Sequence, residues 1–369
     1  MYLVVGAGLT GCIIAHKIAT QLNKKVKIID KNDHMAGNLY DYKDENDILI
    51  HKYGTHIFHT NKPKTWDFIS KFTHLYPYNH TLTARVDGVM IPLPFNLNSI
   101  YKLFSPQMAE AIEVKLINRY GYNKQVPILK LIETKDKDLQ FLANYIYKSI
   151  YLGYISKKRN ISIKEIDKEL ISKISLFINK NDSFYQDKYQ GIPHNGYTKM
   201  CEKMIKHKNI ELKLNQPFKG IDCPDLKQFD KIIYTGGIDE FFEYKFGKLS
   251  YKNFKYETHS YRMEYFQEHF QINYPNEYDY ISTTEYKHLL NQNTKKTTVV
   301  YTYPVKDNTQ GIPSYPDITE ENSRKYTQYL EEAKLLEKCI FAGRLAEFKY
   351  FSMDEAIENA LEVFQSQIK

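Results

Sequence analysis

The alternation of hydrophobic and polar positions predicts a mixed α/β fold that begins at the first residues. An apolar run at Tyr2–Val5 is followed by helical spacing at Ile13–Leu22. A second apolar run, Val26–Ile29, ends at Asp30. Short continuous apolar runs are typical of buried strands, whereas apolar residues every three to four positions indicate a helix. Residues 2–30 therefore predict a strand–helix–strand unit.

The rest of the chain divides into helical and strand-forming stretches. The spacing predicts helices at Met108–Tyr120, Leu139–Leu152, Ser162–Ile178 and Tyr197–Lys206, and a last helix from Asp354. Buried strands are predicted at Lys231–Tyr234 and Cys339–Ala342, and antiparallel strands within residues 250–305, which are rich in β-branched and aromatic residues. Two prolines exclude residues 92–98 from a central strand, because proline cannot donate to the ladder.

The turn after the first predicted strand reads Gly6-Ala7-Gly8-Leu9-Thr10-Gly11. This spacing is typical of a dinucleotide site: Gly6 makes a tight turn, Gly8 lets the backbone approach a pyrophosphate, and Gly11 lets the helix pack on the strand. The free N–H groups at the helix start favour the phosphates. Asp30, at the end of the second strand, suits ribose hydroxyls and disfavours a 2′-phosphate.

Composition narrows the class of ligand. The 369 residues are enough for two or three domains. The net charge of +7 comes from dispersed lysines, which favours a small anionic ligand over nucleic acid, and the 32 tyrosines suit nucleotide and sugar pockets. The four cysteines form no C-x-x-C pair, no secretory signal precedes the first strand, and no apolar run reaches a membrane-spanning length. We therefore expect a reduced, cytoplasmic protein without a membrane span or a metal site.

NAD and FAD share this glycine signature, and three further segments favour FAD. The first, Lys31 to Asn38, contains Gly37 and resembles the flavoprotein segment in which a second glycine turn approaches the FAD diphosphate. The other two, Tyr234-Thr235-Gly236 and Phe341-Ala342-Gly343-Arg344, are similar to the later flavin contacts of such proteins.

Several longer segments are more specific: His51–Thr60 (HKYGTHIFHT), Leu93–Asn96, Tyr189–Pro193, Gly196–Lys199, Ile232–Gly236 and Gly343–Glu347. Together they resemble the bacterial UDP-galactopyranose mutase family nearly from end to end. The resemblance implies an α/β fold with a Rossmann-type FAD-binding domain, an inserted helical domain and a twisted antiparallel β-sheet domain. The implied boundaries are 1–75, 190–245 and 320–369 for the FAD-binding domain, 98–180 for the helical domain with its mobile substrate loop, and 76–97 and 246–319 for the sheet domain.

The resemblance also implies an activity. In this family the N5 of reduced flavin attacks the anomeric carbon of a UDP-sugar and expels UDP; the adduct opens, a different hydroxyl closes the ring, and UDP returns. The implied protein is an isomerase that interconverts pyranose and furanose forms. It would use reduced FAD, an external reductant such as NAD(P)H or a reducing protein, and a homodimeric state, in surface-polysaccharide synthesis.

Site residues follow from matching positions. The resemblance assigns catalytic roles to His56, Arg344 and Tyr350, with Arg344 stabilising the electron-rich reduced ring. Matches to cofactor contacts are Gly6, Gly8, Leu9, Thr10, Gly11, Asp30, Lys31, Gly37, Asn38, His56, Ile57, Thr235, Gly236, Gly343, Arg344 and Met353. Matches to substrate contacts are Tyr154, which would stack on the uracil, Ile155, Arg159, Phe177, Tyr189, Asn273, Ser282 and Tyr350. The alternatives are a satisfied core histidine for His56, a surface ion pair for Arg344, and ordinary core packing for Tyr189, Asn273 and Tyr350.

The substrate site departs from the family pattern. Phe177 and Ser282 stand where two arginines clamp the diphosphate, and Arg159 replaces a loop tryptophan. Phenylalanine and serine cannot bind phosphate bidentately as an arginine does, so Phe177 and Ser282 lack this function. Three interpretations remain: the run Lys157-Lys158-Arg159 replaces the lost charge, the sugar or nucleotide differs, or another hydroxyl closes the ring to an anhydro or bicyclic product. Two further alternatives are an amine-oxidase type of FAD oxidoreductase and a non-catalytic binder.

Overall fold

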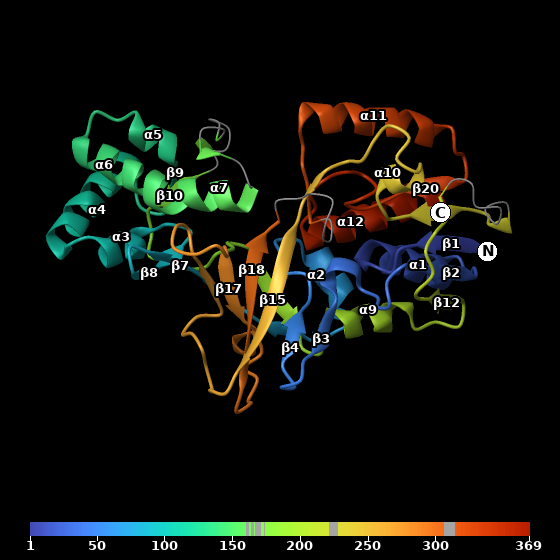
Figure 1. Ribbon diagram of the computed structural model, residues 1–369. Helices are drawn as coiled ribbons and strands as arrows, with labels where there is room; N and C mark the ends of the chain where they lie inside the picture. Colours follow the sequence, from blue (N-terminus) through green and yellow to red (C-terminus); the bar gives the residue numbers. More distant parts are fainter. Residues whose placement is uncertain (160–161, 164–165, 167–170, 173, 221–227, 306–313) are drawn as a thin grey trace.

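The computed structural model describes residues 1–159, 162–163, 166, 171–172, 174–220, 228–305 and 314–369. Figure 1 shows three groups of elements: a parallel sheet with its covering helices on the right, a cluster of helices on the left, and a six-stranded sheet that extends downward between them. The predicted strand–helix–strand unit at the N-terminus is confirmed, and it forms the centre of the first group.

The parallel sheet collects strands from distant parts of the chain. Its order is β12 (Ile210–Lys213), β2 (Val26–Ile29), β1 (Tyr2–Val5), β13 (Ile232–Tyr234) and β20 (Cys339–Phe341), and every neighbouring pair runs parallel. The first, middle and last thirds of the sequence therefore meet in one sheet.

Both faces of this sheet are covered by helices, as is usual for parallel sheets. Val4 of β1 packs into a core with one set of helices, and its neighbours Leu3 and Val5 pack into a core on the opposite face. The first core contains α1 (Leu9–Gln21), α9 (Tyr197–Ile205), α12 (Met353–Val363) and η6 (Phe364–Ile368); the second contains α10 (Ile238–Phe241) and α11 (Glu320–Lys334).

The six-stranded sheet has the order β15 (Phe254–Tyr261), β18 (Thr297–Pro304), β17 (Ser282–Glu285), β16 (Gln271–Asn273), β7 (Leu82–Val86) and β8 (Val89–Leu93). Neighbouring strands are antiparallel except β16 and β7, which run parallel, so the sheet is mixed rather than purely antiparallel as expected. These two strands come from distant segments, so no hairpin dictates their relative direction. Pro92 lies in the edge strand β8, which agrees with its predicted exclusion from a central strand.

The helical cluster packs around one apolar core together with β7 and β8. It contains α3 (Leu97–Leu103), α4 (Pro106–Tyr120), α5 (Ile128–Ile132), α6 (Lys137–Tyr145), η2 (Ile146–Leu152) and α7 (Gly153–Arg159), with the strand pair β9 (Gln125–Pro127) and β10 (Ser175–Phe177). The helix predicted over Ser162–Ile178 is therefore wrong at its end, because pairing with β9 makes Ser175–Phe177 a strand. Residues 164–165, 167–170 and 173 of that prediction lie outside the described part of the chain.

Smaller elements link the groups. They are η1 (Gly37–Leu39), the pair β3 (Asp41–Lys43) and β4 (Leu49–His51), α2 (Pro63–Ser70), the sheet β5 (Phe58–Thr60), β11 (Tyr189–Pro193) and β6 (Leu75–Pro77), η5 (Tyr286–His288), and the pair β14 (Tyr251–Lys252) and β19 (Tyr315–Pro316). A buried core that contains Ile50, Ile57, Ile192 and Val300 joins β4, β11 and β18. Among the described helices, none has the length and apolar character that crossing a membrane requires.

Candidate active site

A cavity of about 760 Å³ lies where the parallel sheet, the six-stranded sheet and α7 meet. This volume is within the usual range for ligand-binding clefts. The predicted cofactor residues that line it are Gly6, Gly8, Leu9, Thr10, Asp30, Lys31, Gly37, Asn38, His56, Ile57, Thr235, Gly236, Gly343, Arg344 and Met353. The predicted substrate residues that line it are Tyr154, Asn273, Ser282 and Tyr350.

The glycine turn after β1 is built at contact distances that exclude larger residues. Gly6 has φ +106°, and a Cβ there would lie 2.0 Å from Thr235 Oγ1. A Cβ on Gly11, which lies in the first turn of α1 and is not part of the described cavity lining, would lie 2.0 Å from the Gly6 carbonyl oxygen. These two glycines therefore let α1, β1 and the residue after β13 pack together.

The same turn leaves a polar surface open to the cavity. Gly8 caps α1 without a side chain, so the first N–H groups of the helix carry no side-chain cap. Gly37 faces it with φ +56°, and a Cβ there would lie 3.1 Å from Gly8 Cα. A cleft with two facing glycines and a helix N-terminus is suited to a diphosphate.

Asp30 is buried at the carboxyl end of β2 and is held by backbone donors. Its Oδ2 accepts from the Ala7 N–H at 2.7 Å, and its Oδ1 accepts from the Asn32 N–H at 2.9 Å. The carboxylate therefore fixes the glycine turn while it lines the cavity.

The C-terminal segment returns to the same cavity after β20. Gly343 has φ +88°, and a Cβ there would lie 2.9 Å from Thr10 Oγ1 of α1. The next residue, Arg344, donates from Nη1 to the Ser314 carbonyl oxygen at 2.6 Å. Burial lowers the pKa of its guanidinium, an effect opposed by the phenolic group of Tyr251, but an arginine remains charged.

Three residues of the cavity lining each have a buried polar atom without a protein partner. Nδ1 of His56, Nδ1 of His80 and Oδ1 of Asn273 have no hydrogen-bond partner among the described residues. All three residues line the cavity. Each of these atoms is itself closed off from solvent, so it lies behind the cavity surface rather than on it.

Burial also keeps His51, His56 and His80 neutral. It lowers the pKa of His51 and of His56 to about 3 and the pKa of His80 to about 4, from the ordinary value of 6.5. The backbone N–H of His56 donates to His51 Nδ1 at 3.1 Å. At neutral pH these imidazoles can donate and accept hydrogen bonds but bring no positive charge to the cavity.

These shifts predict acid sensitivity of the fold. Below pH 6.5 the unfolded chain protonates these histidines, whereas the folded chain does not until about pH 4 or 3, so stability falls as the pH is lowered through that window. Each such group contributes a slope of about 1.4 kcal/mol per pH unit. We expect His80→Asn to reduce the slope by about that amount in urea unfolding measured at several pH values.

The matched control for this prediction is His194→Asn, because His194 is exposed. The raised pKa values of Asp41 and Asp239 act in the opposite direction, but they are common to both variants. An unchanged slope in the His80 variant would contradict the linkage.

The far end of the cavity is lined by tyrosines around Lys158. The rings of Tyr315 and Tyr350 stack at a centroid distance of 5.5 Å. Lys158 Nζ lies 5.5 Å from the Tyr154 ring centroid and 5.8 Å from that of Tyr315. Lys158 and Tyr315 were not among the predicted site residues, although Lys158 stands in the basic run of the loop.

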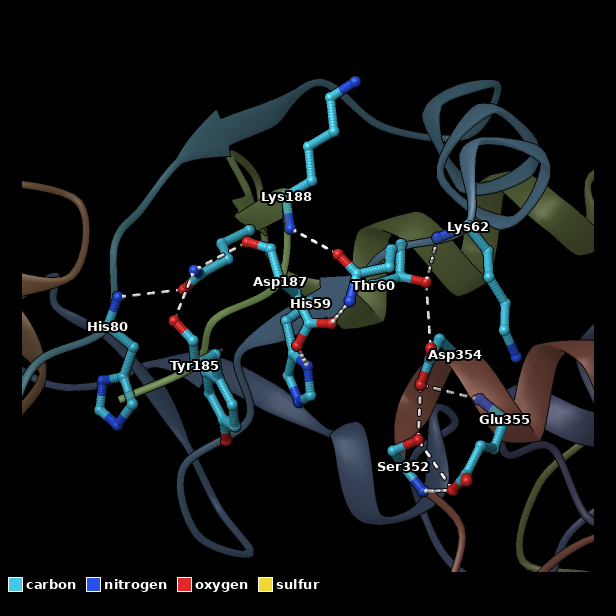
Figure 2. A network of polar contacts seen from close by, with 12 residues as sticks. His59, Thr60, Lys62, His80, Tyr185, Asp187, Lys188, Ser352, Asp354 and Glu355 are labelled. Carbon is cyan, nitrogen blue, oxygen red and sulfur yellow. Dashed lines mark hydrogen bonds and ion pairs between the residues drawn. The ribbon is translucent and has the colours of Figure 1, made fainter. Parts of the chain in front are cut away.

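Figure 2 shows a second group of polar side chains, which the sequence motifs did not predict as part of the site. His59 Nδ1 lies 2.7 Å from Asp187 Oδ2, and the His59 ring stacks on Tyr185 at 3.7 Å. Gln190 donates from Nε2 to the carbonyl oxygens of Tyr185 and Asp187. His59, His80 and Tyr185 line the cavity, so this network presents an oriented imidazole to it. The sequence contained a signal for this group, because His59 lies three residues after His56 in the segment His51–Thr60.

Other predicted substrate residues lie away from the cavity wall. Tyr189 stacks on Trp66 at 5.3 Å, and Phe177 pairs through β10 with β9 and forms a bridge with Asn96. Ile155 packs against the core of the helical cluster. The structure therefore does not bring these three side chains to the described lining. Arg159 ends α7, and its side chain lies outside the described part.

Comparisons with known proteins agree with this geometry. The family model for UDP-galactopyranose mutase matches residues 149–350, and the model for the NAD(P)-binding Rossmann-like domain matches residues 4–72. The chain is 31% identical to dTDP-fucopyranose mutase of Escherichia coli, covering 100% of this chain and 98% of that one. It is 30% identical to a probable UDP-galactopyranose mutase of Klebsiella pneumoniae, covering 98% and 92%.

Solved structures support the fold. A crystal structure of reduced UDP-galactopyranose mutase matches with a TM-score of 0.69 and 13% identity, covering 99% of this chain and 93% of that one. The predicted α/β fold with a Rossmann-type domain is confirmed. The relatives of this chain are sugar mutases, which are isomerases, so the predicted enzyme class is confirmed as well. The chain belongs to the UDP-galactopyranose mutase family.

Proposed function

We propose that the cavity binds FAD, with the diphosphate held by the glycine turn and the start of α1. Three features support this assignment: α1 has no side-chain cap, Gly8 and Gly37 face each other, and Gly343 lies close to Thr10. Gly6, Gly8, Gly37, Thr235 and Arg344 are the residues that would hold it. Bound and reduced by an external donor such as NAD(P)H, FAD would supply an electron-rich nitrogen that attacks an anomeric carbon.

We further propose that the activity is interconversion of the pyranose and furanose forms of a nucleotide sugar. The observation that carries this proposal is that one cavity runs from the glycine turn to the tyrosines around Lys158. One end suits a dinucleotide, and the other offers aromatic rings and a cation to a second nucleotide ligand.

The chain's own residues have separable roles in this reaction. Arg344 places a positive charge on the cavity wall, where it would stabilise the negative charge of a reduced flavin. His56 and His80 are neutral and offer ring nitrogens to the cofactor or to sugar hydroxyls. His59, held by Asp187, is the candidate for moving a proton during ring opening and closure.

The names of the relatives indicate two candidate substrates, UDP-galactopyranose and dTDP-fucopyranose, and both should be assayed. We expect dithionite-reduced protein to convert at least one of them to a furanose, seen as a new anomeric signal in proton NMR. The oxidised protein is the control and should give no product. An anhydro sugar would indicate a different ring closure, and binding of both without any product would support the non-catalytic alternative.

A further inference from the structure

The two lysines in the basic run of α7 have different surroundings. Lys157 donates from Nζ to the carbonyl oxygens of Tyr274 at 2.6 Å and Tyr278 at 2.7 Å. Both carbonyls belong to the connection between β16 and β17. Lys157 therefore fastens α7 to the six-stranded sheet, and its donors are directed at the protein.

A second contact strengthens this attachment. Asn276 donates from Nδ2 to the Ser149 carbonyl oxygen at 2.7 Å, just before α7. A Cβ on Gly153, the first residue of α7, would lie 2.1 Å from Asn276 Oδ1. The helix start is thus held at close range, and this fixes the direction in which the next side chains point.

Lys158 lines the cavity instead. It is half-buried among tyrosine rings, and no carboxylate forms an ion pair with it among the described residues. The phenolic group of Tyr154, followed by those of Tyr315 and Tyr350, raises the pKa of its ammonium group against the effect of burial. Lys158 is therefore a charged donor that faces the space a ligand would fill.

The carboxylates that line the cavity lie apart from Lys158. Among the described lining residues the carboxylates are Asp30, Asp239 and Glu240. Each is engaged at the dinucleotide end: Asp30 by backbone N–H groups, Glu240 by Lys31 at 2.7 Å, and Asp239 by the Leu249 N–H at 2.9 Å. No described carboxylate lines the end that holds Lys158, so that end favours an anion.

We propose that Lys158 binds the diphosphate of the nucleotide sugar, while Lys157 holds α7 in place for it. The inference rests on the proposed function and deepens it, because it names the residue that recognises the group shared by UDP and dTDP. A lysine serves here as a point charge with three donors, and the neighbouring phenolic hydroxyls supply further hydrogen bonds.

The test is titration calorimetry of UDP, dTDP and uridine against the flavin-containing protein and its Lys158→Ala variant. Hydrogen bonds to charged groups predict that the variant binds UDP and dTDP about ten- to hundredfold more weakly. Uridine has no phosphate, so its affinity should stay within about threefold of the wild-type value. Lys158→Arg, which keeps the charge, should retain most of the affinity for the diphosphates.

Lys148→Ala is the matched control, because Lys148 is an exposed lysine on η2, ahead of α7. It should bind all three compounds as the wild type does, and circular dichroism should show that each variant is folded. Unchanged UDP binding in Lys158→Ala, or an equal loss of uridine binding, would overturn the inference while leaving the proposed function intact. Wild-type protein that binds neither UDP nor dTDP would instead refute the proposed function and the inference with it.

Discussion

Replacing Arg344 with alanine is expected to lower kcat by about a hundred- to thousandfold, the usual effect of removing one donor that stabilises developing charge. Arg344 lines the cavity and donates a hydrogen bond to the Ser314 carbonyl oxygen. If its charge stabilises reduced FAD, the variant should also have a lower flavin midpoint potential, by about 30 mV for each 1.4 kcal/mol lost. Steady-state kinetics on the converted sugar and a redox titration are the two measurements.

The Arg344→Lys variant distinguishes the effect of the positive charge from that of the planar guanidinium group. It should keep the potential near the wild-type value, because the charge is retained, but lose part of kcat with the planar fork. Flavin content should be unchanged in both variants if the glycine turn dominates cofactor binding. A kcat within about threefold of wild type in Arg344→Ala would show that this charge does not act on the reaction.

Replacing Gly8 with valine is expected to yield folded protein that lacks FAD. The nearest atom to a Cβ at Gly8 is Gly37 Cα at 3.8 Å, and the φ of Gly8 is −76°, so the fold tolerates a side chain there. The added methyl groups would occupy the approach to the uncapped N–H groups of α1. Since each lost hydrogen bond to a charged group costs about tenfold or more in affinity, FAD binding should weaken at least a hundredfold.

The measurement is flavin absorbance per protein chain, with circular dichroism as the folding check. Gly88→Asn is the control, because Gly88 lies in the turn between β7 and β8 with φ +81° and no atom within 4 Å of a Cβ. Asparagine tolerates such a backbone, so this variant should keep its flavin. Wild-type flavin content in Gly8→Val would exclude the glycine turn as the diphosphate site.

The N-terminal unit was predictable because its determinants are local. Three glycines and two apolar runs within residues 2–30 specify the turn, the helix and both strands without reference to the rest of the chain. Gly37, Thr235 and Gly343 were also predicted as cofactor contacts, and all three line the cavity. Each belongs to a short segment that contains a glycine and resembles a flavin-contact segment.

The errors arose where distant pairing decides the outcome. Ser175–Phe177 is a strand because β9 lies beside it, and a short apolar run cannot by itself be assigned to helix or strand. Tyr189 and Tyr185 lie four residues apart in a tyrosine-rich segment, yet only Tyr185 is on the cavity wall of the described structure. The position of Tyr185 depends on the contacts that His59 of β5 makes with Asp187 and Tyr185, which precede β11, and no single segment reveals these contacts.

The order in which the chain is made has a consequence for the parallel sheet. Its central strand β1 is the first to be synthesised, whereas its edge strand β20 and the helix α12, which packs on α1, are among the last. During translation the glycine turn is therefore exposed long before Gly343 and Arg344 arrive to complete the wall around it. Flavin loading should be a post-translational event, and a ribosome that stops before β20 should release a chain with an intact glycine motif but no site to retain the cofactor.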